Sequence, residues 1–472
     1  MIENSLTFQQ HLKQQNTLRS ISSKIKLNNA QERTNNSNIV SFVAGTVLTW
    51  TSPVLDRLGN ATTTPFDHPV SLDERSWISS FFPLGAIFGP FIFGFLADQI
   101  GRKKTLIISG IPFVVCYYLL AFSRHVVVYY IARFFLGIAL GGVYTVIPMY
   151  AGEIADNSNR GTLGSMMNVY LCFGLFFSYC LGPFVNLMTF NIILGTFPII
   201  FLVIFTLIAP ESPVYLLSKN DIRGAKIALQ KVRGYNEDIN QELDMIQNKI
   251  EEDGKGSVID IFKSKPLTKA LGITVTLGVI QQFSGVIAVF FYAQTIFEQA
   301  GSSLKPEICS IVIGSVQFLT SFLTPFLVDR WGRKLLLLIS AAGMALSEIL
   351  LGIYCLLHDH HYDVASITFL PIICLMAYIF MYNFGYGPLP WVIMGETFPP
   401  NVKSSASSIT AAICWIAGFI IGKYFEPLVV IIGIGPAFLI FSGICILAVP
   451  FCLFLVVETK GKSVQEILRD LE

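Results

Sequence analysis

Long apolar stretches recur along almost the whole chain, and they constrain its fold more than any other feature. Twelve of them lie near residues 39–56, 76–97, 105–123, 126–150, 163–186, 190–209, 269–298, 307–329, 335–357, 366–394, 404–427 and 431–457. A bilayer core about 30 Å thick needs roughly 20 helical residues per crossing, and the stretches have about that length. They do not alternate polar and apolar residues, as the strands of a membrane barrel do. The pattern predicts an all-α membrane protein with twelve transmembrane helices.

The composition supports this class and excludes others. Only 13% of the 472 residues are charged, whereas a soluble domain has about 25%. The formal net charge of +1 favours no nucleic-acid partner. The nine cysteines lie in apolar stretches or at the edge of one, without metal-ligand spacing, and are interpreted as small core residues. Because no nucleophile–base pair or metal motif occurs, we expect neither an enzyme nor a bound cofactor or metal.

Polar segments divide the chain into five parts. Residues 1–38 form a polar tail that lacks the apolar core of a signal peptide. Residues 39–209 and 269–457 each contain six apolar stretches. Between them, residues 210–268 show helical amphipathic periodicity and are expected to form a helical linker. Residues 458–472 are a short second tail.

The loops between the apolar stretches predict the orientation in the membrane. Basic residues gather on the side of the N-terminal tail, namely Arg102, Lys103, Lys104, Arg160, Arg330, Arg333, Lys334 and Lys403. By the positive-inside rule, both termini are expected in the cytoplasm of a plasma-membrane protein. The opposite side carries Asn60-Ala61-Thr62, which predicts glycosylation at Asn60. The histidines at 358, 360 and 361 are interpreted as part of a solvated outer loop rather than a metal site.

Two charged signatures occur twice, once in each half of the chain. Asp98-x-x-Gly101-Arg102-Lys103 recurs as Asp329-x-x-Gly332-Arg333-Lys334. Gly152-Glu153 with Arg160 seven residues later recurs as Gly395-Glu396 with Lys403. This duplication predicts two pseudo-symmetric six-helix halves, a common plan among transporters.

The duplicated charges suggest a gate at the cytoplasmic helix ends. The candidates are Asp98, Arg102, Glu153, Arg160, Asp329, Arg333, Glu396 and Lys403. One exposed ion pair contributes only about 0–1 kcal/mol, but several together can bias a two-state equilibrium. We hypothesise that these pairs hold the cytoplasmic side shut and separate when it opens. The alternative is that the bases only retain loops inside, which does not explain the acids repeated in register.

A series of motifs resembles the sugar porter family of the major facilitator superfamily. Besides the signatures above, the motifs are Arg133, Pro148-x-Tyr150-x-Gly152-Glu153, Pro210-Glu211-Ser212-Pro213, Gln281-Gln282-Phe283-Ser284-Gly285, Gly387-Pro388-x-Pro390-Trp391 and Glu458-Thr459-Lys460-Gly461-Lys462. Thr51-Ser52-Pro53 and Gly395-Glu396 resemble the insect facilitated trehalose transporters in particular. The resemblance implies a major facilitator fold, a central cavity between the halves, and transport of trehalose or a hexose by alternating access as a monomer.

Three residues suit a sugar by their chemistry. Hydroxyl groups need amides that donate and accept hydrogen bonds, and a sugar ring stacks on an aromatic face. Gln281 and Gln282 supply adjacent amides, and Trp391 follows a helix-breaking run of Gly and Pro. The alternatives are helix–helix hydrogen bonding for the glutamines and a lipid-facing position for Trp391. Since consecutive helical residues point about 100° apart, one shared helix partner is not expected.

The resemblance adds further cavity positions, some of which depart from the family pattern. Asn168, Gln317 and Asn383 stand where the family has related polar residues, whereas Ile287 and Cys414 replace asparagines. Losing an amide costs a substrate hydroxyl about 1–3 kcal/mol if that hydroxyl is left unpaired. A transport-impaired sugar sensor on the same fold is therefore the first alternative function.

Acidic residues within the apolar stretches indicate whether transport is coupled to protons. Proton-driven relatives carry an Asp in the first apolar stretch, but residues 45–50 contain no acid, which favours uniport. Glu348 lies in the middle of the ninth stretch. An intramembrane carboxyl is a functional hypothesis by default, so a proton-coupled sugar symporter is the second alternative, beside a local hydrogen bond or a protonated Glu348.

Overall fold

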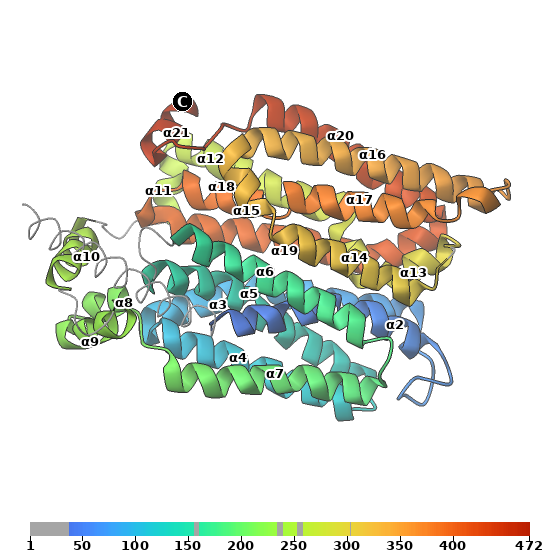
Figure 1. The fold of residues 1–472 in the computed structure, drawn as a ribbon, viewed down its shortest axis with the longest axis horizontal. Helices are drawn as coiled ribbons and strands as arrows, with labels where there is room; N and C mark the ends of the chain where they lie inside the picture. Colours follow the sequence, from blue (N-terminus) through green and yellow to red (C-terminus); the bar gives the residue numbers. More distant parts are fainter. Residues whose placement is uncertain (1–36, 155–159, 234–238, 253–257, 303) are drawn as a thin grey trace, which may run out of the picture.

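The computed structural model describes residues 37–154, 160–233, 239–252, 258–302 and 304–472. Helices run along the longest axis of the molecule and form two bundles that lie side by side (Figure 1). No strand occurs among the described residues. The prediction of an all-α protein built from two helical halves is confirmed.

The first bundle contains six transmembrane segments. The first segment is helical over residues 37–49 and continues as α2 (Thr51–Gly59). The others are α3 (Leu72–Ile100), α4 (Arg102–Phe122), α5 (Val126–Ile154), α6 (Arg160–Leu181) and α7 (Leu187–Ile208).

The second bundle also contains six transmembrane segments, and three of them are divided into shorter helices. Span 7 consists of α12 (Lys265–Gln281), the π-helical turn η1 (Gln282–Val286) and α13 (Ile287–Gln299), and span 8 of α14 (Pro306–Ser321) and α15 (Thr324–Trp331). Span 9 is α16 (Arg333–Asp359), and the turn η2 (Ala365–Ile367) precedes span 10, which consists of α17 (Leu370–Phe384) and α18 (Leu389–Thr397). Spans 11 and 12 are α19 (Pro400–Ile432) and α20 (Ile434–Phe454).

Ten of these spans are long and apolar enough to cross a membrane within the part of the chain that is described. The other two are α6, whose apolar part is Met166–Leu181, and span 8, which bends between α14 and α15. Together they match the twelve predicted crossings. The short helices α8 (Pro213–Ser218), α9 (Ile222–Arg233), α10 (Asn240–Glu252), α11 (Val258–Lys263) and α21 (Val464–Asp470) all lie at one end of the bundles (Figure 1). We call this end the tail end and the opposite end the loop end.

Glycines let the helices of the first bundle touch along their backbones. A Cβ on Gly85 of α3 would lie 1.9 Å from the carbonyl oxygen of Phe134, and a Cβ on Gly137 of α5 would lie 2.0 Å from that of Phe82. Each glycine is followed by another at i+4, Gly89 and Gly141 in the two helices. Small residues at this spacing are typical of close helix pairs in membranes, where packing rather than the hydrophobic effect holds helices together.

Two spans of the second bundle break partway along their length. In span 7, Gly285 has φ of 85° within η1, a conformation that only glycine adopts at little cost. A Cβ there would also lie 2.6 Å from the ring of Phe441. In span 10, α17 ends at Phe384 and α18 begins at Leu389, as the Gly/Pro run predicted. The glutamine motif and Trp391 therefore lie beside these breaks.

Candidate functional site

Gln281 connects the break in span 7 to the break in span 10. Its Nε2 donates to the carbonyl oxygens of Tyr386 and Gly387 at 2.8 and 2.7 Å and lies 3.2 Å from the hydroxyl of Tyr382. The side chain is buried. The amide nitrogen therefore satisfies backbone carbonyl groups at the helix break, and this contact stabilises the fold.

Gln282 points to a different helix. Its Nε2 lies 3.0 Å from the sulfur of Cys414 in α19, while its Oε1 is buried and has no hydrogen-bond partner in the described part of the chain. A Cβ on Gly418 would lie 3.6 Å from this oxygen and 3.7 Å from Pro83 of α3. The oxygen thus lies where the two bundles meet. An unpaired buried acceptor costs free energy, and a sugar hydroxyl is a suitable donor for it.

Aromatic rings from both bundles gather near this point. The ring centroid of Tyr144 in α5 lies 6.2 Å from that of Trp391 and 6.3 Å from that of Trp415. Trp415 in turn lies 6.1 Å from Phe82 of α3. Trp391 is half-buried. Together these rings present the flat apolar faces on which a sugar ring can stack.

Sequence reasoning did not identify Tyr144 and Trp415 as part of the site. Tyr144 is one of several aromatic residues in an apolar stretch, and only packing shows that it faces the other bundle. Trp415 follows Cys414 directly, so its position beside a predicted site residue was the available signal.

The other predicted substrate residues lie on the same inner helices. Gln317 of α14 is buried, and its Nε2 lies 3.9 Å from the sulfur of Cys172 in α6. Its Oε1 has no hydrogen-bond partner within the described ranges. Asn168, one turn before Cys172, accepts a weak bond from that sulfur at 3.9 Å. Asn383 donates to the hydroxyl of Thr320 at 2.7 Å and to the carbonyl of Gln317 at 3.2 Å. Asn383 therefore joins spans 8 and 10, whereas Gln317 reaches across the bundles.

The two positions that depart from the family pattern are both apolar and buried. Ile287 is 2% exposed at the start of α13, within the hydrophobic core. Cys414 is fully buried between Gln282 and the carbonyl oxygen of Gly278, which lies 3.5 Å from its sulfur. The sulfur stands where the family pattern has the side-chain amide of an asparagine. It is only a weak hydrogen-bond acceptor for Gln282.

In each half the duplicated arginine pairs with an acid of another span. Arg102 pairs with Glu153 at 3.0 Å and also with Asp98, at the end of α3, at 3.4 Å. In the second half, Arg333 pairs with Glu396 at 2.7 Å. Lys403 donates to the carbonyl oxygen of Gly395. Arg102–Glu153 and Arg333–Glu396 each join helices of the same half. The side chains of Arg160 and Asp329 lie outside the described part of the structure.

A further pair of carboxylates repeats the symmetry at the tail end. Glu211 accepts a bond from the backbone N–H of Lys103 at 2.9 Å, and Glu458 accepts from the N–H groups of Arg333 and Lys334 at 2.9 and 3.0 Å. They cap the N-termini of α4 and α16, where the helix dipole favours negative charge. Partial burial opposes ionisation of Glu458, but its backbone donors outweigh this cost and hold the pKa of Glu458 below its ordinary value.

Glu348 lies apart from these clusters. It is 1% exposed in α16, and neither carboxyl oxygen has a hydrogen-bond partner among the described residues. Its polar neighbours are Cys445 and Tyr378. Tyr378 donates to the carbonyl oxygen of Ser284 at 2.7 Å, so only one residue separates Glu348 from the glutamine motif.

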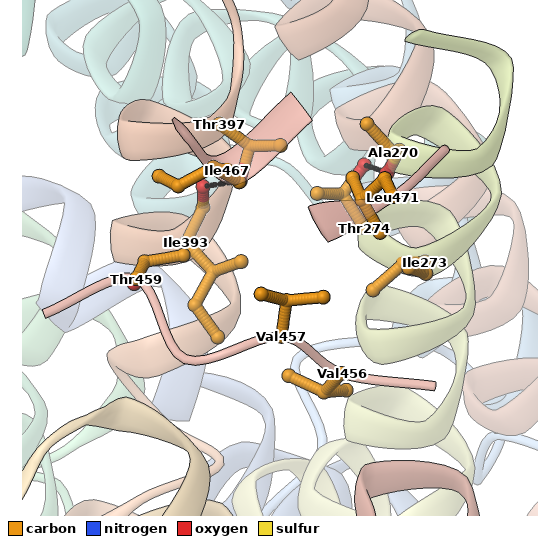
Figure 2. A pocket seen from close by; sticks show the side chains of 10 residues that line it. All are labelled: Ala270, Ile273, Thr274, Ile393, Thr397, Val456, Val457, Thr459, Ile467 and Leu471. Carbon is orange, nitrogen blue, oxygen red and sulfur yellow. Dashed lines mark hydrogen bonds between the residues drawn. The ribbon is translucent and has the colours of Figure 1, made fainter. Parts of the chain in front are cut away.

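A small pocket at the tail end is distinct from this region. It encloses about 10 Å³ between α12, α18 and the segment before α21 (Figure 2), which is room for about one water molecule. Its lining is mostly apolar, with Thr274, Thr397 and Thr459 as polar groups. None of the predicted substrate residues lines it, and it is too small for a sugar. No group of three or more His, Cys, Asp and Glu in the described ranges is arranged to hold a metal ion.

Comparisons with known proteins agree with this architecture. Residues 23–471 match the family described as "Sugar (and other) transporter". The chain is 34% identical over 438 residues to a facilitated trehalose transporter homolog of Drosophila simulans, covering 92% of this chain and 89% of that protein. It is also 34% identical over 438 residues to a facilitated trehalose transporter of Polypedilum vanderplanki, covering 91% of this chain and 86% of that protein.

Solved structures show the same fold. The inward-open xylose transporter of E. coli has a TM-score of 0.77 and 22% identity, covering 94% of this chain and all of that chain. A proton:xylose symporter bound to 6-bromo-6-deoxy-D-glucose has a TM-score of 0.77 and 23% identity, covering 95% of this chain and all of that chain. The matched proteins are transporters rather than enzymes. The chain belongs to the sugar transporter family and is a multi-pass membrane protein with the major facilitator fold.

Proposed function

We propose that this protein is a facilitative transporter for a neutral sugar, trehalose or a hexose, that works by alternating access across the plasma membrane. The observation that carries the proposal is the buried, unpaired Oε1 of Gln282 between the two bundles, close to Gly418 and Pro83. Rings from both bundles lie nearby. The tail end faces the cytosol in this proposal, because the basic loops lie there.

The substrate class follows from the chemistry of the site. Gln282 and Gln317 each offer an unpaired amide oxygen, and the rings of Trp391, Tyr144 and Trp415 offer stacking surfaces. Such a set suits an uncharged polyol better than an ion. Trehalose is the first candidate because the relatives above are named as trehalose transporters.

Two positions, in the first and fourth spans, favour uniport over proton-coupled transport. Residues 45–50 contain no acid. Arg133 of α5 is fully buried and donates to the carbonyl oxygens of Ile78 and Val47 at 3.2 and 3.1 Å. Its guanidinium also lies over three rings, Phe82, Trp50 and Phe291. None of these contacts is a carboxylate that binds and releases a proton during the cycle.

In this proposal the duplicated charges brace the cytoplasmic helix ends of each half, rather than separating when that side opens. Arg102–Glu153 and Arg333–Glu396 fix helix ends within each half, so each half moves as a unit. We further propose that the protein functions as a monomer and carries a glycan on Asn60. Asn60 is exposed at the loop end, and its Oδ1 accepts from the hydroxyl of Thr62 at 2.8 Å.

The sensor alternative is favoured by one specific observation. The amide nitrogens of Gln281 and Gln282 both bond within the second bundle, to backbone carbonyls and to Cys414. Fewer donors are then free for a sugar than two glutamines would suggest. Such a site can bind a sugar weakly without carrying it.

Uptake into proteoliposomes separates these functions. The purified protein is reconstituted and supplied with labelled trehalose, glucose or fructose, with and without a proton gradient. We expect saturable uptake of at least one sugar that the gradient does not change. Sugar binding without saturable uptake would favour the sensor, and uptake accelerated by an inward proton gradient would favour the symporter. Protein-free vesicles are the control.

A further inference from the structure

Two charged residues lie among apolar residues in the second half of α19 and contact the first bundle. Lys423 and Glu426 are three residues apart, so they share one face of the helix. Their side chains are 10% and 7% exposed. Charged groups at such positions are costly unless they are paired, and both find their partners on the opposite bundle.

Glu426 pairs with Arg75, near the start of α3. Arg75 Nε lies 2.9 Å from Glu426 Oε1, and Arg75 Nη2 lies 3.3 Å from Asp56 of α2. Asp56 also accepts a bond from the hydroxyl of Thr295 in α13 at 3.0 Å. Span 1 and span 2 of the first bundle are thereby tied to span 7 and span 11 of the second.

Lys423 forms a second connection close by. Its Nζ lies 2.6 Å from Asp73 and 2.8 Å from the hydroxyl of Ser76, both at the start of α3. The same ammonium lies 4.1 Å from the centroid of the Trp77 ring. One cation thus contacts a carboxylate, a hydroxyl and an aromatic face on the other bundle, a combination stronger than an isolated surface ion pair.

The signs of charge are exchanged between the bundles. The first bundle contributes the cation Arg75 and the anion Asp73, and the second contributes the anion Glu426 and the cation Lys423. By contrast, Arg102–Glu153 and Arg333–Glu396 at the tail end connect helices of one half. Rotation of the halves leaves those tail-end pairs intact, whereas opening at the loop end separates Arg75 from Glu426 and Lys423 from Asp73.

We propose that Arg75–Glu426 and Lys423–Asp73, which join the halves at the loop end, form a latch that holds the extracellular side shut and sets how often it opens. This inference rests on the proposed function, because it takes the loop end as extracellular and the halves as moving parts. Asp56 makes the latch reversible. It belongs to the same bundle as Arg75, so Arg75 retains one carboxylate partner after Glu426 has left.

A cysteine at position 80 reports on this opening. Ser80 of α3 is fully buried, and its Cα lies 3.6 Å from the place of a Cβ on Gly422 in α19. Ser80→Cys is nearly isosteric and faces the seam below the latch. Its rate of reaction with a membrane-impermeant methanethiosulfonate added outside intact cells measures exposure from that side. The parent chain without this substitution gives the background from the nine native cysteines.

We expect Glu426→Gln and Asp73→Lys, each combined with Ser80→Cys, to raise the labelling rate about tenfold, equivalent to about 1.4 kcal/mol. Adding Lys423→Glu to Asp73→Lys restores an opposite-charge pair and should return the rate most of the way. Asp67→Asn is the matched control, because Asp67 is an exposed acid in the loop just before α3, and it should leave the rate unchanged. Asp73 is 75% exposed, so its replacement tests the latch even if Glu426→Gln lowers the amount of folded protein.

The outcomes separate the latch from the transport function, because uptake of labelled sugar is measured on the same cells. Unchanged labelling in both single variants, or no return of the rate in the charge-swapped variant, would overturn the latch while sugar uptake still supports transport. Faster labelling without any uptake would uphold the latch and contradict transport.

Discussion

Replacing Gln282 by Ala should weaken sugar binding about tenfold without disturbing the fold. Among the described residues, the one hydrogen bond of this amide joins its Nε2 to the sulfur of Cys414, a weak interaction. The Oε1 is buried and unpaired, so a bound sugar hydroxyl is its natural donor. Truncation leaves that hydroxyl without this acceptor, at a cost of about 1–3 kcal/mol if it stays unpaired. A value near 1.4 kcal/mol corresponds to tenfold.

The neighbouring Gln281 supplies a matched comparison. Its Nε2 bonds to the carbonyl oxygens of Tyr386 and Gly387 at the break in span 10. Gln281→Ala leaves these buried acceptors unpaired, so we expect a lower melting temperature and a smaller change in KM than for Gln282→Ala. The two substitutions remove the same atoms from consecutive positions, so each serves as a control for the other.

The assay measures two quantities on each purified variant. The concentration dependence of uptake into proteoliposomes gives KM, and thermal unfolding in detergent gives the melting temperature. The reasoning predicts a change chiefly in KM for Gln282→Ala and chiefly in melting temperature for Gln281→Ala. The reverse pattern, or an unchanged KM for Gln282→Ala, would refute the assignment of Gln282 as a sugar ligand.

Three further predictions follow from other parts of the structure. Trp391→Ala should lower uptake about tenfold, equivalent to about 1.4 kcal/mol, because it removes a stacking face near Tyr144. Trp331→Ala, at a half-exposed position, is the control in the same uptake assay. Equal effects of the two substitutions would contradict the stacking role of Trp391. Glu348→Gln should leave uptake unchanged and insensitive to a proton gradient, and a gained or lost gradient effect would instead support coupling. Glu458→Gln should lower the melting temperature at neutral pH, where the carboxylate caps α16. Because the pKa of Glu458 is lowered in the folded protein, its contribution is present above its ordinary value of 4.5 and is lost as the pH falls through the lower folded value. The difference from the parent should therefore shrink in acid, and a difference that grows there would contradict the capping role.

The transmembrane plan could be read from the sequence because lipid leaves few choices. Backbone polar groups have no water partner in a bilayer, so each long apolar stretch must be helical. The duplicated Asp-x-x-Gly-Arg-Lys motif identified two halves in register. Its glycines, Gly101 and Gly332, have φ of 99° and 82°. A Cβ on either would lie within 3 Å of a capping carboxylate oxygen, which explains why both turns carry glycine.

The break in span 7 was not predicted, although Gly285 carried the signal. A single Gly inside a helical pattern is usually tolerated, and only the approach of Phe441 from α20 shows why it takes positive φ. The partners of the two glutamines were also beyond the sequence. Their divergent directions were predicted from helix geometry, but which one meets the break in span 10 depends on tertiary packing.

The charges at the loop end were missed for a different reason. Lys423 and Glu426 stand in an apolar stretch, which is the signal for an intramembrane functional group. Their partners Asp73 and Arg75 are more than 300 positions away in the chain and lie in a helix start that looks like a solvated loop boundary. The exchange of signs between the bundles becomes visible only when the halves are packed together.

Accessibility of the site from both aqueous phases tests the central claim most directly. Gly418→Cys is the most suitable reporter, because a Cβ there meets only ordinary contacts and lies 3.6 Å from the Oε1 of Gln282. An impermeant thiol reagent is added to one side of sealed vesicles at a time, with and without saturating sugar. Alternating access predicts modification from both sides and protection by the transported sugar. Modification from neither side, or the same rate with and without sugar, would contradict it.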